Sequence, residues 1–325
     1  MLCIYNQNTE PYFNIALEEY FLKNFQEDIF ILWNSTPSII VGKHQNTTGE
    51  VNLLYAETNK IPVIRRISGG GTVYHDEGNL NFTFIKNGQE GKLIDFKKYT
   101  TPIIIALQKL NLNVTLGKRN DLLLEDKKIS GNAEHIFKNR ALHHGTLLFN
   151  SNLDNLNTAI LPTTGKITDK SVKSNRSTVT NSLEHLQKKI SFEEFKKHIF
   201  QEVIAQQECY LYFLEESDKI QIQHLVEIKY KTAEWNFAYS PPYTFEKTAT
   251  NENGWITIIL NVEKNIIKNI NFESSNNHKP YLDFLKNNLL LLEHNKTELT
   301  LRLNKFAETN NFPTQLLELL KNAII

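Results

Sequence analysis

Three consecutive glycines with two arginines at their entrance, Arg65-Arg66-Ile67-Ser68-Gly69-Gly70-Gly71, constrain the fold of this chain more than any other stretch. The apolar residues 61–64 before them predict a buried strand, and the alternating polar and apolar residues 79–85 after them predict a half-buried strand. Glycine adopts backbone dihedrals closed to other residues and lets a second molecule approach the main chain closely. Successive N–H groups in such a turn form an anion-binding concavity, and a nearby arginine adds a planar charged fork. We therefore predict a loop between two strands that holds an anion.

A flexible hairpin is the plainer interpretation of the same loop. A hairpin turn needs only one or two glycines, however, and three in a row are costly in conformational entropy. The loop is not a Walker A motif, because Gly71 is not followed by Lys-Ser/Thr, and it lacks the spaced glycines of a dinucleotide site. The anion is therefore predicted without a standard nucleotide-binding motif.

The composition is that of an ordinary globular protein. The 325 residues are 40% hydrophobic and 22% charged, a length that suits two domains. Lysine plus arginine equals aspartate plus glutamate, 36 each, so charge does not favour a nucleic-acid partner. We see neither a signal-peptide pattern nor an apolar run long enough to cross a bilayer, and two cysteines, Cys3 and Cys209, make no disulfide framework or zinc cluster. We expect a cytoplasmic protein without a nucleic-acid or membrane partner.

Periodicity in the first 110 residues mixes helical and strand patterns. On a first predicted helix, Glu18 and Glu19 turn away from the apolar face, and Pro102 suits the first turn of a later helix. The predicted elements are a helix over 11–25, strands over 29–33 and 38–42, a helix over 49–59 and a helix over 101–110.

A second informative region lies between residues 117 and 149. It predicts polar turns over 117–121 and 127–133, a short strand over 122–124 and a strand over 141–149 that pairs nearby. Lysines in a turn, such as Lys127 and Lys128, are normally solvated. His143 and His144 face opposite ways on a strand and lack a third ligand at a recognisable spacing, so they are not a metal pair.

The remaining chain divides at a double proline, Pro241-Pro242, which makes a stiff connection. We therefore predict one domain over residues 1–243 and a small second domain over 244–325 that has no catalytic constellation. Before the boundary lie a polar segment over 153–180, basic over 163–176, a helix over 191–207 and a helix over 222–230. After it lie strands over 255–260 and 266–272 that turn at 263–265, and helices over 281–292, 296–304 and 314–323.

Four motifs, in this order and spacing, strongly resemble the lipoate–protein ligase family. They are Arg-Arg-x-Ser-Gly-Gly-Gly-Thr-Val-Tyr-His-Asp at 65–76, Arg-Asn-Asp at 119–121, Lys-Ile-Ser-Gly-Asn-Ala at 128–133 and His-His-Gly-Thr-Leu-Leu at 143–148. The likeness covers nearly the whole chain. It implies an α+β fold: a biotin/lipoate-ligase-like catalytic domain with mixed sheets and flanking helices, plus a small α+β C-terminal accessory domain.

The resemblance also implies an activity. The family uses ATP to convert lipoate to lipoyl-adenylate and pyrophosphate, and octanoate is an alternative substrate. The acyl group then passes to one lysine of a carrier: the lipoyl domain of a 2-oxoacid dehydrogenase acyltransferase subunit, or the glycine-cleavage H protein. Magnesium is the expected metal.

Site residues follow from the same resemblance. Lys128 would hold the lipoyl carboxylate against the α-phosphate, because two anions that react need fixed positive charge between them. Arg66 would grip phosphate, Ser68 would donate a hydroxyl, and His144 would line the lipoyl side while His143 faces away. Further nucleotide contacts are the main chain of Gly70, Gly71, Thr72, Val73 and Tyr74, then Asn120 for the adenylate and Asp121 for magnesium.

Other parts of the implied site are less defined. A plain polar turn remains an alternative for Asp121. The apolar end of lipoate needs a slot near Trp33 and Val73, and the basic 163–176 segment resembles a loop that folds over the adenylate, although none of its residues receives a role.

Two other functions remain open. An octanoyl or lipoyl amidotransferase of the same fold needs no ATP and carries the acyl group on a cysteine, but neither Cys3 nor Cys209 lies in a motif. A non-catalytic protein that binds lipoyl domains could keep the fold, although an intact Lys128, Arg66 and triple glycine speak against it.

Overall fold

A computed structural model of the chain describes residues 1–88, 91, 93–162, 165–252, 254–275, 278–310 and 312–324. Thr163 and Thr164 of the basic segment lie outside the described residues. The chain forms two compact units. The first contains residues 1–43, 54–161 and 173–232, and the second contains residues 44–53, 162–172 and 233–325. These units do not follow a single cut in the chain, and the functional division at residues 243/244 stays a prediction.

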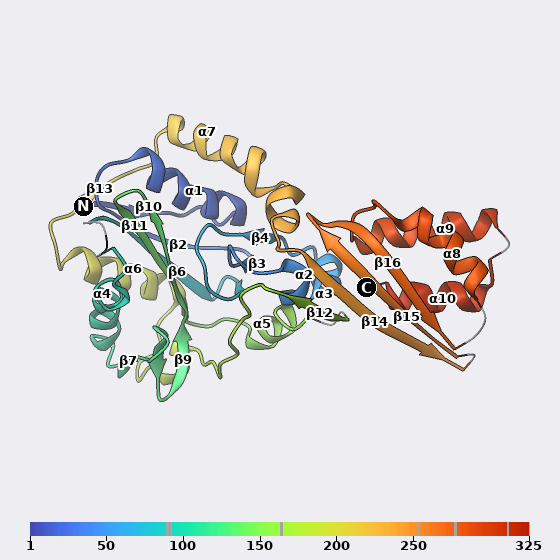
Figure 1. The fold of residues 1–325 in the computed structure, drawn as a ribbon. Helices are drawn as coiled ribbons and strands as arrows, with labels where there is room; N and C mark the ends of the chain where they lie inside the picture. The colour runs from blue at the N-terminus through green and yellow to red at the C-terminus, as the bar shows by residue number, and fades with distance from the viewer. Residues whose placement is uncertain are drawn as a thin grey trace. The chain divides into compact units, whose positions relative to one another are not determined.

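A six-stranded mixed sheet is the centre of the first unit (Figure 1). Its strand order is β10-β11-β6-β2-β1-β13. Strand β1 runs parallel to β2 and β13, whereas the β2–β6, β6–β11 and β10–β11 pairs are antiparallel. The strands are β1 (Leu2–Tyr5), β2 (Ile29–Asn34), β6 (Asn79–Asn87), β10 (Asn132–Phe137), β11 (Arg140–Leu148) and β13 (Tyr210–Leu211).

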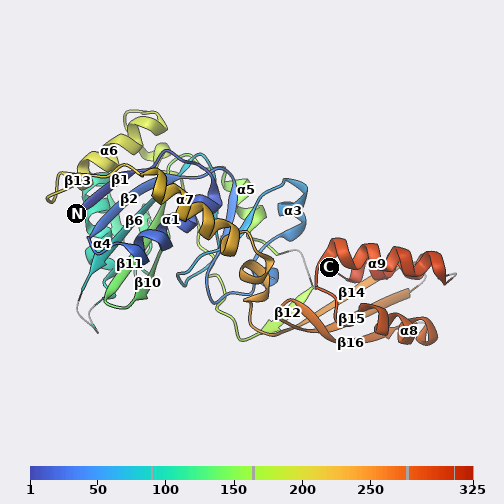
Figure 2. The ribbon, with the colours of Figure 1, turned by 90° about the horizontal axis from the view of Figure 1, so that it is seen from above.

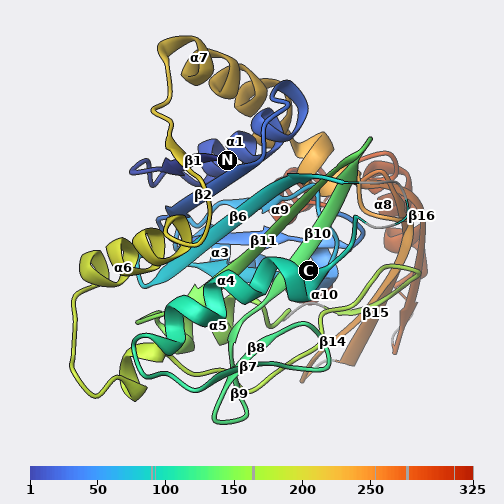
Figure 3. The same ribbon diagram turned by 90° about the vertical axis from the view of Figure 1, so that its left-hand side faces the viewer.

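Helices cover both faces of this sheet (Figure 3). Helices α4 (Phe96–Gln108) and α6 (Phe192–Ile204) cover the face that carries Phe30 and Phe84, whose rings stack 4.8 Å apart. Helix α1 (Pro11–Asn24) covers the other face, and α7 (Glu216–Leu225) lies beside it (Figure 2). The main hydrophobic core therefore lies between the sheet and the α4–α6 layer.

Strand β6 is buried on both faces, so the prediction of a half-buried strand is wrong. Its polar residues Asn79, Asn81 and Thr83 lie under α1 and not in solvent. They bond inside the protein: the Trp33 indole donates to the Thr83 hydroxyl at 3.1 Å, and the Asn79 amide donates to Asn81 at 3.0 Å. A polar layer is thus enclosed between helix and sheet.

The glycine-rich loop belongs to a separate three-stranded sheet, β4-β3-β5. The strands are β3 (Ser38–Val41), β4 (Val63–Arg65) and β5 (Val73–His75). The loop joins β4 to β5, both of which pair with β3, while β6 lies in the large sheet. The prediction that the loop joins the strand before it directly to β6 is therefore wrong, because β5 intervenes.

Residues 127–130 and 132–133 belong to strands, with Gly131 between them, so the predicted turn over 127–133 is wrong. The reversal occurs earlier, at Glu125 and Asp126, whose φ angles are 49° and 61°. Strand β9 (Lys127–Ser130) then pairs with β8 (Leu122–Leu124), which pairs with β7 (Val114–Leu116). Lys128 consequently stands on a strand.

Other helix boundaries differ from the sequence-based ones. The region 49–59 forms two short helices, α2 (Thr47–Glu50) and α3 (Leu53–Thr58). Helix α4 begins at Phe96, where the Asp95 side chain caps it, so Pro102 lies inside the helix and not in its first turn. The polar segment 153–180 contains α5 (Leu153–Ala159) and β12 (Lys166–Asp169). Helix 191–207 is confirmed, since Ser191 and Glu194 form a capping box at its start.

The second unit is built on an antiparallel sheet, β12-β14-β15-β16. The predicted turn between β15 and β16 is confirmed at Lys264 and Asn265, both with positive φ. Helices α8, α9 and α10 provide the other half of its core. Bounds are β14 (Tyr243–Asn251), β15 (Gly254–Glu263), β16 (Ile266–Ser274), α8 (Lys279–Leu289), α9 (Lys296–Thr309) and α10 (Thr314–Ala323).

The predicted α+β class, with mixed sheets, flanking helices and a small C-terminal α+β part, is confirmed. Within the described ranges, every helix is too short or too polar to cross a membrane.

Candidate active site

Arg66 organises the glycine-rich loop from within. Its guanidinium donates to the carbonyls of Gly69 at 2.5 Å, Gly71 at 2.8 Å and Ile40 at 3.1 Å, and to the Ser68 hydroxyl at 2.9 Å. The side chain is buried, and burial lowers its pKa to about 10, partly offset by the charge of Glu18. Arg66 therefore keeps its positive charge at neutral pH directly beneath the loop. Its predicted contact with phosphate stays a prediction.

The glycines of the loop differ in what they allow. Gly70 has a φ of +82°, and a Cβ there would lie 3.2 Å from the Arg66 guanidinium. A Cβ on Gly71 would lie 3.1 to 3.3 Å from Ser174, whereas one on Gly69 would meet nothing within 4 Å. The loop thus needs glycine at Gly70 for its backbone conformation and at Gly71 for a close approach.

A buried chain of hydrogen bonds continues from Arg66 through Ser68 and His144 to Glu18. The Ser68 hydroxyl lies 2.6 Å from His144 Nε2, and His144 Nδ1 lies 2.9 Å from a Glu18 carboxylate oxygen. Because the Glu18 carboxylate only accepts hydrogen bonds, the proton of the neutral His144 ring is assigned to Nδ1, and the Ser68 hydroxyl then donates to Nε2. The hydroxyl that was predicted to donate to a ligand donates to His144 in this arrangement.

Glu18 is a site residue that sequence reasoning missed. The helical pattern turned it away from the apolar face, but it is 1% exposed and also accepts from the Thr83 hydroxyl at 2.5 Å. The alternating polar residues of β6 could have indicated it. Once that strand is buried, its polar side chains need polar partners on the element that covers it. The prediction that Glu18 and Glu19 avoid the buried side of α1 is wrong.

The two adjacent histidines face opposite sides of β11, as predicted. His143 points into the α4 layer, where it stacks on Tyr99 at 5.1 Å and pairs with Glu134 at 2.9 Å. Burial lowers its pKa, and Glu134 opposes that shift. Only His144 contributes to the polar layer beneath the loop.

Lys128 lies against Asp121. Its ammonium nitrogen is 2.9 Å from an Asp121 carboxylate oxygen, and the two side chains are 24% and 14% exposed. A Cβ on Gly131 would lie 3.1 Å from that nitrogen, so glycine leaves room for the amine. The neighbouring Asn120 has a φ of 62°, and its carbonyl accepts from Asn132 at 2.8 Å. The structure therefore brings three predicted residues, Asn120, Asp121 and Lys128, to one end of the β7–β9 sheet.

Residues 174–180, which we call the strap, connect the loop to Lys128. At one end, the Thr72 N–H donates to the Ser174 hydroxyl at 3.0 Å. At the other, the Lys128 N–H donates to Thr178 at 2.9 Å and the Thr180 N–H donates to the Lys128 carbonyl at 3.1 Å. Sequence reasoning assigned no residue here a role, and the strap's polar composition gives no periodic signal for this pairing. The two halves of the predicted site are joined through it.

The other predicted main-chain contacts lie in β5. Val73 and Tyr74 pair with Ile40 and Ile39 of β3. Tyr74 is buried, and burial raises the pKa of its phenol to about 12. This stretch is therefore held by sheet pairing beside the loop, and its contact with nucleotide stays a prediction.

A magnesium site would depend on Asp121. No group of three histidine, cysteine or acidic side chains that could hold a metal occurs in the part of the chain that the structure describes. Magnesium commonly binds through one or two carboxylates together with substrate phosphates and waters, so a single carboxylate at the site fits an ion that arrives with a nucleotide. The metal role of Asp121 stays a prediction.

His75 is a buried histidine beside the same network. It is 4% exposed, its ring lies 5.5 Å from Trp33, and its Nδ1 has no hydrogen-bond partner among the described residues. Burial, the charge of Arg66 and the neighbouring His144 lower its pKa to about 3. His75 is thus neutral in the folded protein at neutral pH.

The depressed pKa of His75 predicts a loss of stability in mild acid. The unfolded chain takes up a proton near the ordinary value of 6.5, whereas the folded chain does not until about 3, so stability falls as pH drops below 6.5. For one such group the loss is about 2 kcal/mol between neutral pH and about pH 5. Urea unfolding at both pH values should show a smaller loss for His75→Gln than for the unmodified protein. The exposed His224→Gln should keep the full loss, and an unchanged loss in His75→Gln would contradict this account.

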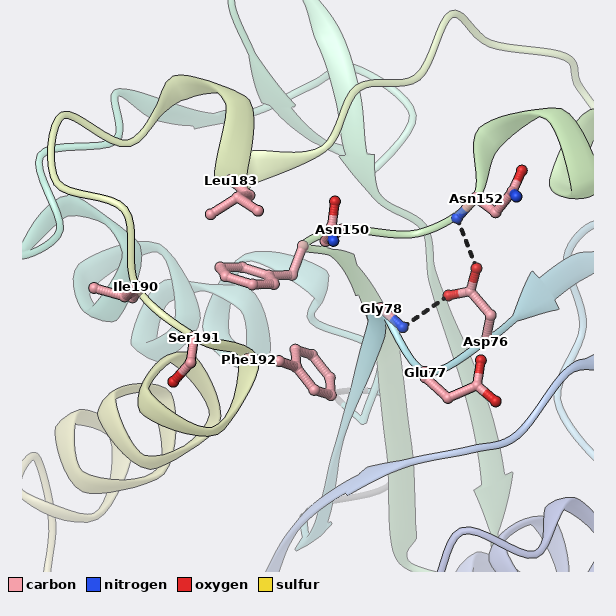
Figure 4. A pocket seen from close by; sticks show the side chains of 10 residues that line it. Asp76, Glu77, Gly78, Asn150, Asn152, Leu183, Ile190, Ser191 and Phe192 are labelled. Carbon is pink, nitrogen blue, oxygen red and sulfur yellow. Dashed lines mark hydrogen bonds between the residues drawn. The ribbon is translucent and has the colours of Figure 1, made fainter.

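A cavity of about 400 Å³ opens next to the end of the loop motif (Figure 4). Asp76 at its edge accepts from the backbone N–H groups of Gly78 at 3.0 Å and Asn152 at 2.7 Å, which fixes the turn after β5. The apolar side chains that line it are Phe149, Leu183, Ile190 and Phe192. None of the predicted site residues lines this cavity, and we assign it no part in the reaction.

Comparison with known proteins gives matches along the chain. Residues 10–204 match the model of the lipoyl protein ligase A/B catalytic domain, and residues 240–324 match that of the bacterial lipoate protein ligase C-terminus. Lipoate–protein ligase 1 of Staphylococcus aureus is 43% identical over 265 residues, which is 81% of each chain.

Solved structures share the fold. P. falciparum LipL1 in complex with lipoate has a TM-score of 0.63 and 25% identity, covering 98% of this chain and 99% of that one. A lipoate-protein ligase A bound with ATP has a TM-score of 0.61 and 24% identity, covering 72% of this chain and 97% of that one.

Proposed function

The chain belongs to the lipoate–protein ligase family, and on that premise we propose that it converts lipoate and ATP to lipoyl-adenylate and pyrophosphate. It would then transfer the lipoyl group to one lysine of a carrier: a lipoyl domain of a 2-oxoacid dehydrogenase acyltransferase subunit, or the glycine-cleavage H protein. Octanoate is a second acyl substrate in this proposal. The supporting observation is that one strap connects the glycine-rich loop to Lys128.

Lys128 supplies the charge that the first step requires. A carboxylate that attacks the α-phosphate brings two anions together, so a cation held between them lowers the barrier. The Lys128 amine is a flexible point charge that is partly exposed and pairs with Asp121 at 2.9 Å. It would leave Asp121 and contact both the lipoyl carboxylate and the phosphate.

The glycine-rich loop supplies hydrogen-bond donors and a fixed positive charge. Main-chain groups from Gly70 to Tyr74 would contact the nucleotide, with Asn120 at the adenylate. Arg66 shapes this loop through its carbonyls and adds positive charge beneath it. The bonds to Ser68, Ile40, Gly69 and Gly71 use four of the five N–H groups of Arg66, so a direct contact with phosphate would use the fifth or replace one of these bonds. A magnesium ion at Asp121, when bound, would neutralise phosphate charge.

The polar layer beneath the loop would face the lipoyl side. His144 uses both ring nitrogens within the protein, so it would offer a ligand its ring and not a hydrogen bond. Trp33 lies next to this layer with its indole N–H bonded to Thr83. We place the apolar slot for the dithiolane near Trp33 and Val73.

Two broader assignments remain proposals. Residues 1–243 would form the catalytic domain and 244–325 the accessory domain, and the protein would act in the cytoplasm.

The amidotransferase alternative receives no support from Cys3. A thiol that carries an acyl group needs a lowered pKa and access to substrate. Cys3 is 1% exposed, and burial raises the pKa of its thiol. Cys3 is therefore unsuited to that role.

Intact-mass measurement of carriers tests the proposal directly. The protein is incubated with lipoate, ATP, magnesium and either a lipoyl domain or H protein, with matched reactions that omit ATP or lipoate. We expect a mass gain of one lipoyl group on the carrier and release of pyrophosphate only in the complete reaction. Transfer without ATP would favour the amidotransferase, and carrier binding without any mass gain would favour the non-catalytic protein.

A further inference from the structure

The Ser174 hydroxyl occupies a main-chain donor of the glycine-rich loop. The Thr72 N–H donates to it at 3.0 Å, and Thr72 is only 6% exposed. Thr72 follows directly after the three glycines, within the stretch that would contact the nucleotide. The N–H that a phosphoryl oxygen would use is therefore covered by a side chain of the strap.

Gly71 is what permits this contact. A Cβ at Gly71 would lie 3.1 Å from the Ser174 hydroxyl oxygen and 3.3 Å from both its Cα and Cβ. These distances are tighter than ordinary van der Waals contacts and involve backbone as well as side chain. A Cβ on Gly69, by contrast, would meet no atom within 4 Å. The third glycine therefore lets the strap close onto the loop.

The strap is anchored at its far end. Two backbone bonds hold Lys128 to Thr178 and Thr180, at 2.9 and 3.1 Å. At the other end, the Ser174 side-chain oxygen accepts from the Thr72 N–H, and Ser174 packs on Gly71. Release at Ser174 would therefore leave the pairing with Lys128 in place.

We propose that the Ser174 hydroxyl stands in for a phosphoryl oxygen in the ligand-free protein and is displaced when the phosphate of ATP binds. This inference rests on the proposed function, because it takes the main chain from Gly70 to Tyr74 as the stretch that contacts the nucleotide and assigns its Thr72 N–H to a phosphoryl oxygen. While the Ser174 oxygen accepts from the Thr72 N–H, a phosphoryl oxygen cannot take the same hydrogen-bonding position. Ser174 thus lowers nucleotide affinity by the free energy of the bond that must first be broken.

Substitution of Ser174 by alanine tests the displacement. The net free energy of one hydrogen bond predicts ATP and AMP binding tighter by roughly threefold to tenfold in Ser174→Ala, measured by calorimetry without lipoate. A carboxylate at the same place accepts more strongly and repels phosphate, so Ser174→Asp should weaken ATP binding by more than about tenfold. Ser177 lies in the same strap, and Ser177→Ala and Ser177→Asp are the matched controls, expected to leave the affinity unchanged. Equal or weaker ATP binding by Ser174→Ala would overturn the inference.

A ligand-free measurement separates this inference from the proposed function. Hydrogen exchange of the Thr72 amide should be faster in Ser174→Ala than in the unmodified protein, and unchanged in Ser177→Ala. Unchanged exchange at Thr72 would also overturn the inference, even where the protein lipoylates its carrier. Failure of the unmodified protein to bind ATP at all would instead refute the proposed function, and the inference with it.

Discussion

Replacing Lys128 by methionine is expected to lower the rate of lipoate-dependent adenylation by about 10³-fold, at the upper end of what loss of one transition-state donor costs. Methionine keeps the length and apolar stem of the side chain but removes the charge. The reacting carboxylate and phosphate then repel each other without a cation between them. The rate is measured as exchange of labelled pyrophosphate into ATP in the presence of lipoate.

The adjacent lysine is the matched control. Lys127 is exposed and on the same strand, so Lys127→Met should keep the exchange rate within about twofold, as exposed substitutions usually do. Lys128→Arg keeps the charge but has a planar fork in place of a point charge, and it should recover only part of the rate. A Lys128→Met protein that exchanges pyrophosphate normally would remove Lys128 from the catalytic step.

Replacing Arg66 by lysine is expected to weaken ATP binding by about 100-fold and to destabilise the protein by about 3 kcal/mol, since buried acceptors that lose a donor cost about 1 to 3 kcal/mol each. The reason is geometric. One guanidinium bonds three carbonyls and the Ser68 hydroxyl at once, and a lysine amine cannot reach all four acceptors. The loop should therefore lose its shape. The chain of hydrogen bonds that runs to Glu18 should also lose the bond from residue 66 to Ser68. Urea unfolding and the ATP KM in pyrophosphate exchange measure the two effects.

The two effects also separate the roles available to Arg66. If Arg66 supports the loop, Arg66→Lys should lower both the ATP affinity and the stability. If Arg66 instead contacts phosphate directly, the ATP affinity should fall while the stability stays unchanged. The exposed Arg302→Lys in the second unit should change neither quantity. Retention of both stability and affinity in Arg66→Lys would contradict the role described for Arg66.

The glycine-rich loop shows how far sequence reasoning reaches. Three glycines next to arginines indicated a loop built for close approach, and the structure places a buried guanidinium under it. The separate reasons for Gly70, with its positive φ, and Gly71, with Ser174 against it, depend on neighbours distant in the chain. Local chemistry predicted the loop, but only tertiary contacts explain each residue in it.

Helix α1 shows why an amphipathic pattern misled. The pattern assumes that the polar side of a helix faces water. On α1, Glu18 faces the polar layer of β6, and Glu19 bonds Lys229 at 2.7 Å and Tyr230, which follow α7. Because α1 is covered on both sides, its polar residues are buried and paired. Nothing in residues 11–25 alone signals that α7 packs there.

The surroundings of Lys128 also lay beyond local patterns. Glycine and polar residues over 127–133 favour a turn, but the positive φ angles of Glu125 and Asp126 place the reversal earlier and make Lys128 a strand residue. Its pairing with residues about 50 positions later has no periodic signature. The family resemblance identified Lys128, whereas Ser174 and Glu18 emerged only from the structure.

A crystal structure with a stable analogue of lipoyl-adenylate tests the central claim most directly. We expect the Lys128 amine to have left Asp121 and to lie at hydrogen-bonding distance, about 2.9 Å, from oxygens on both the acyl and the phosphate side of the analogue. An amine still paired with Asp121, or directed into solvent away from the nucleotide, would contradict the account.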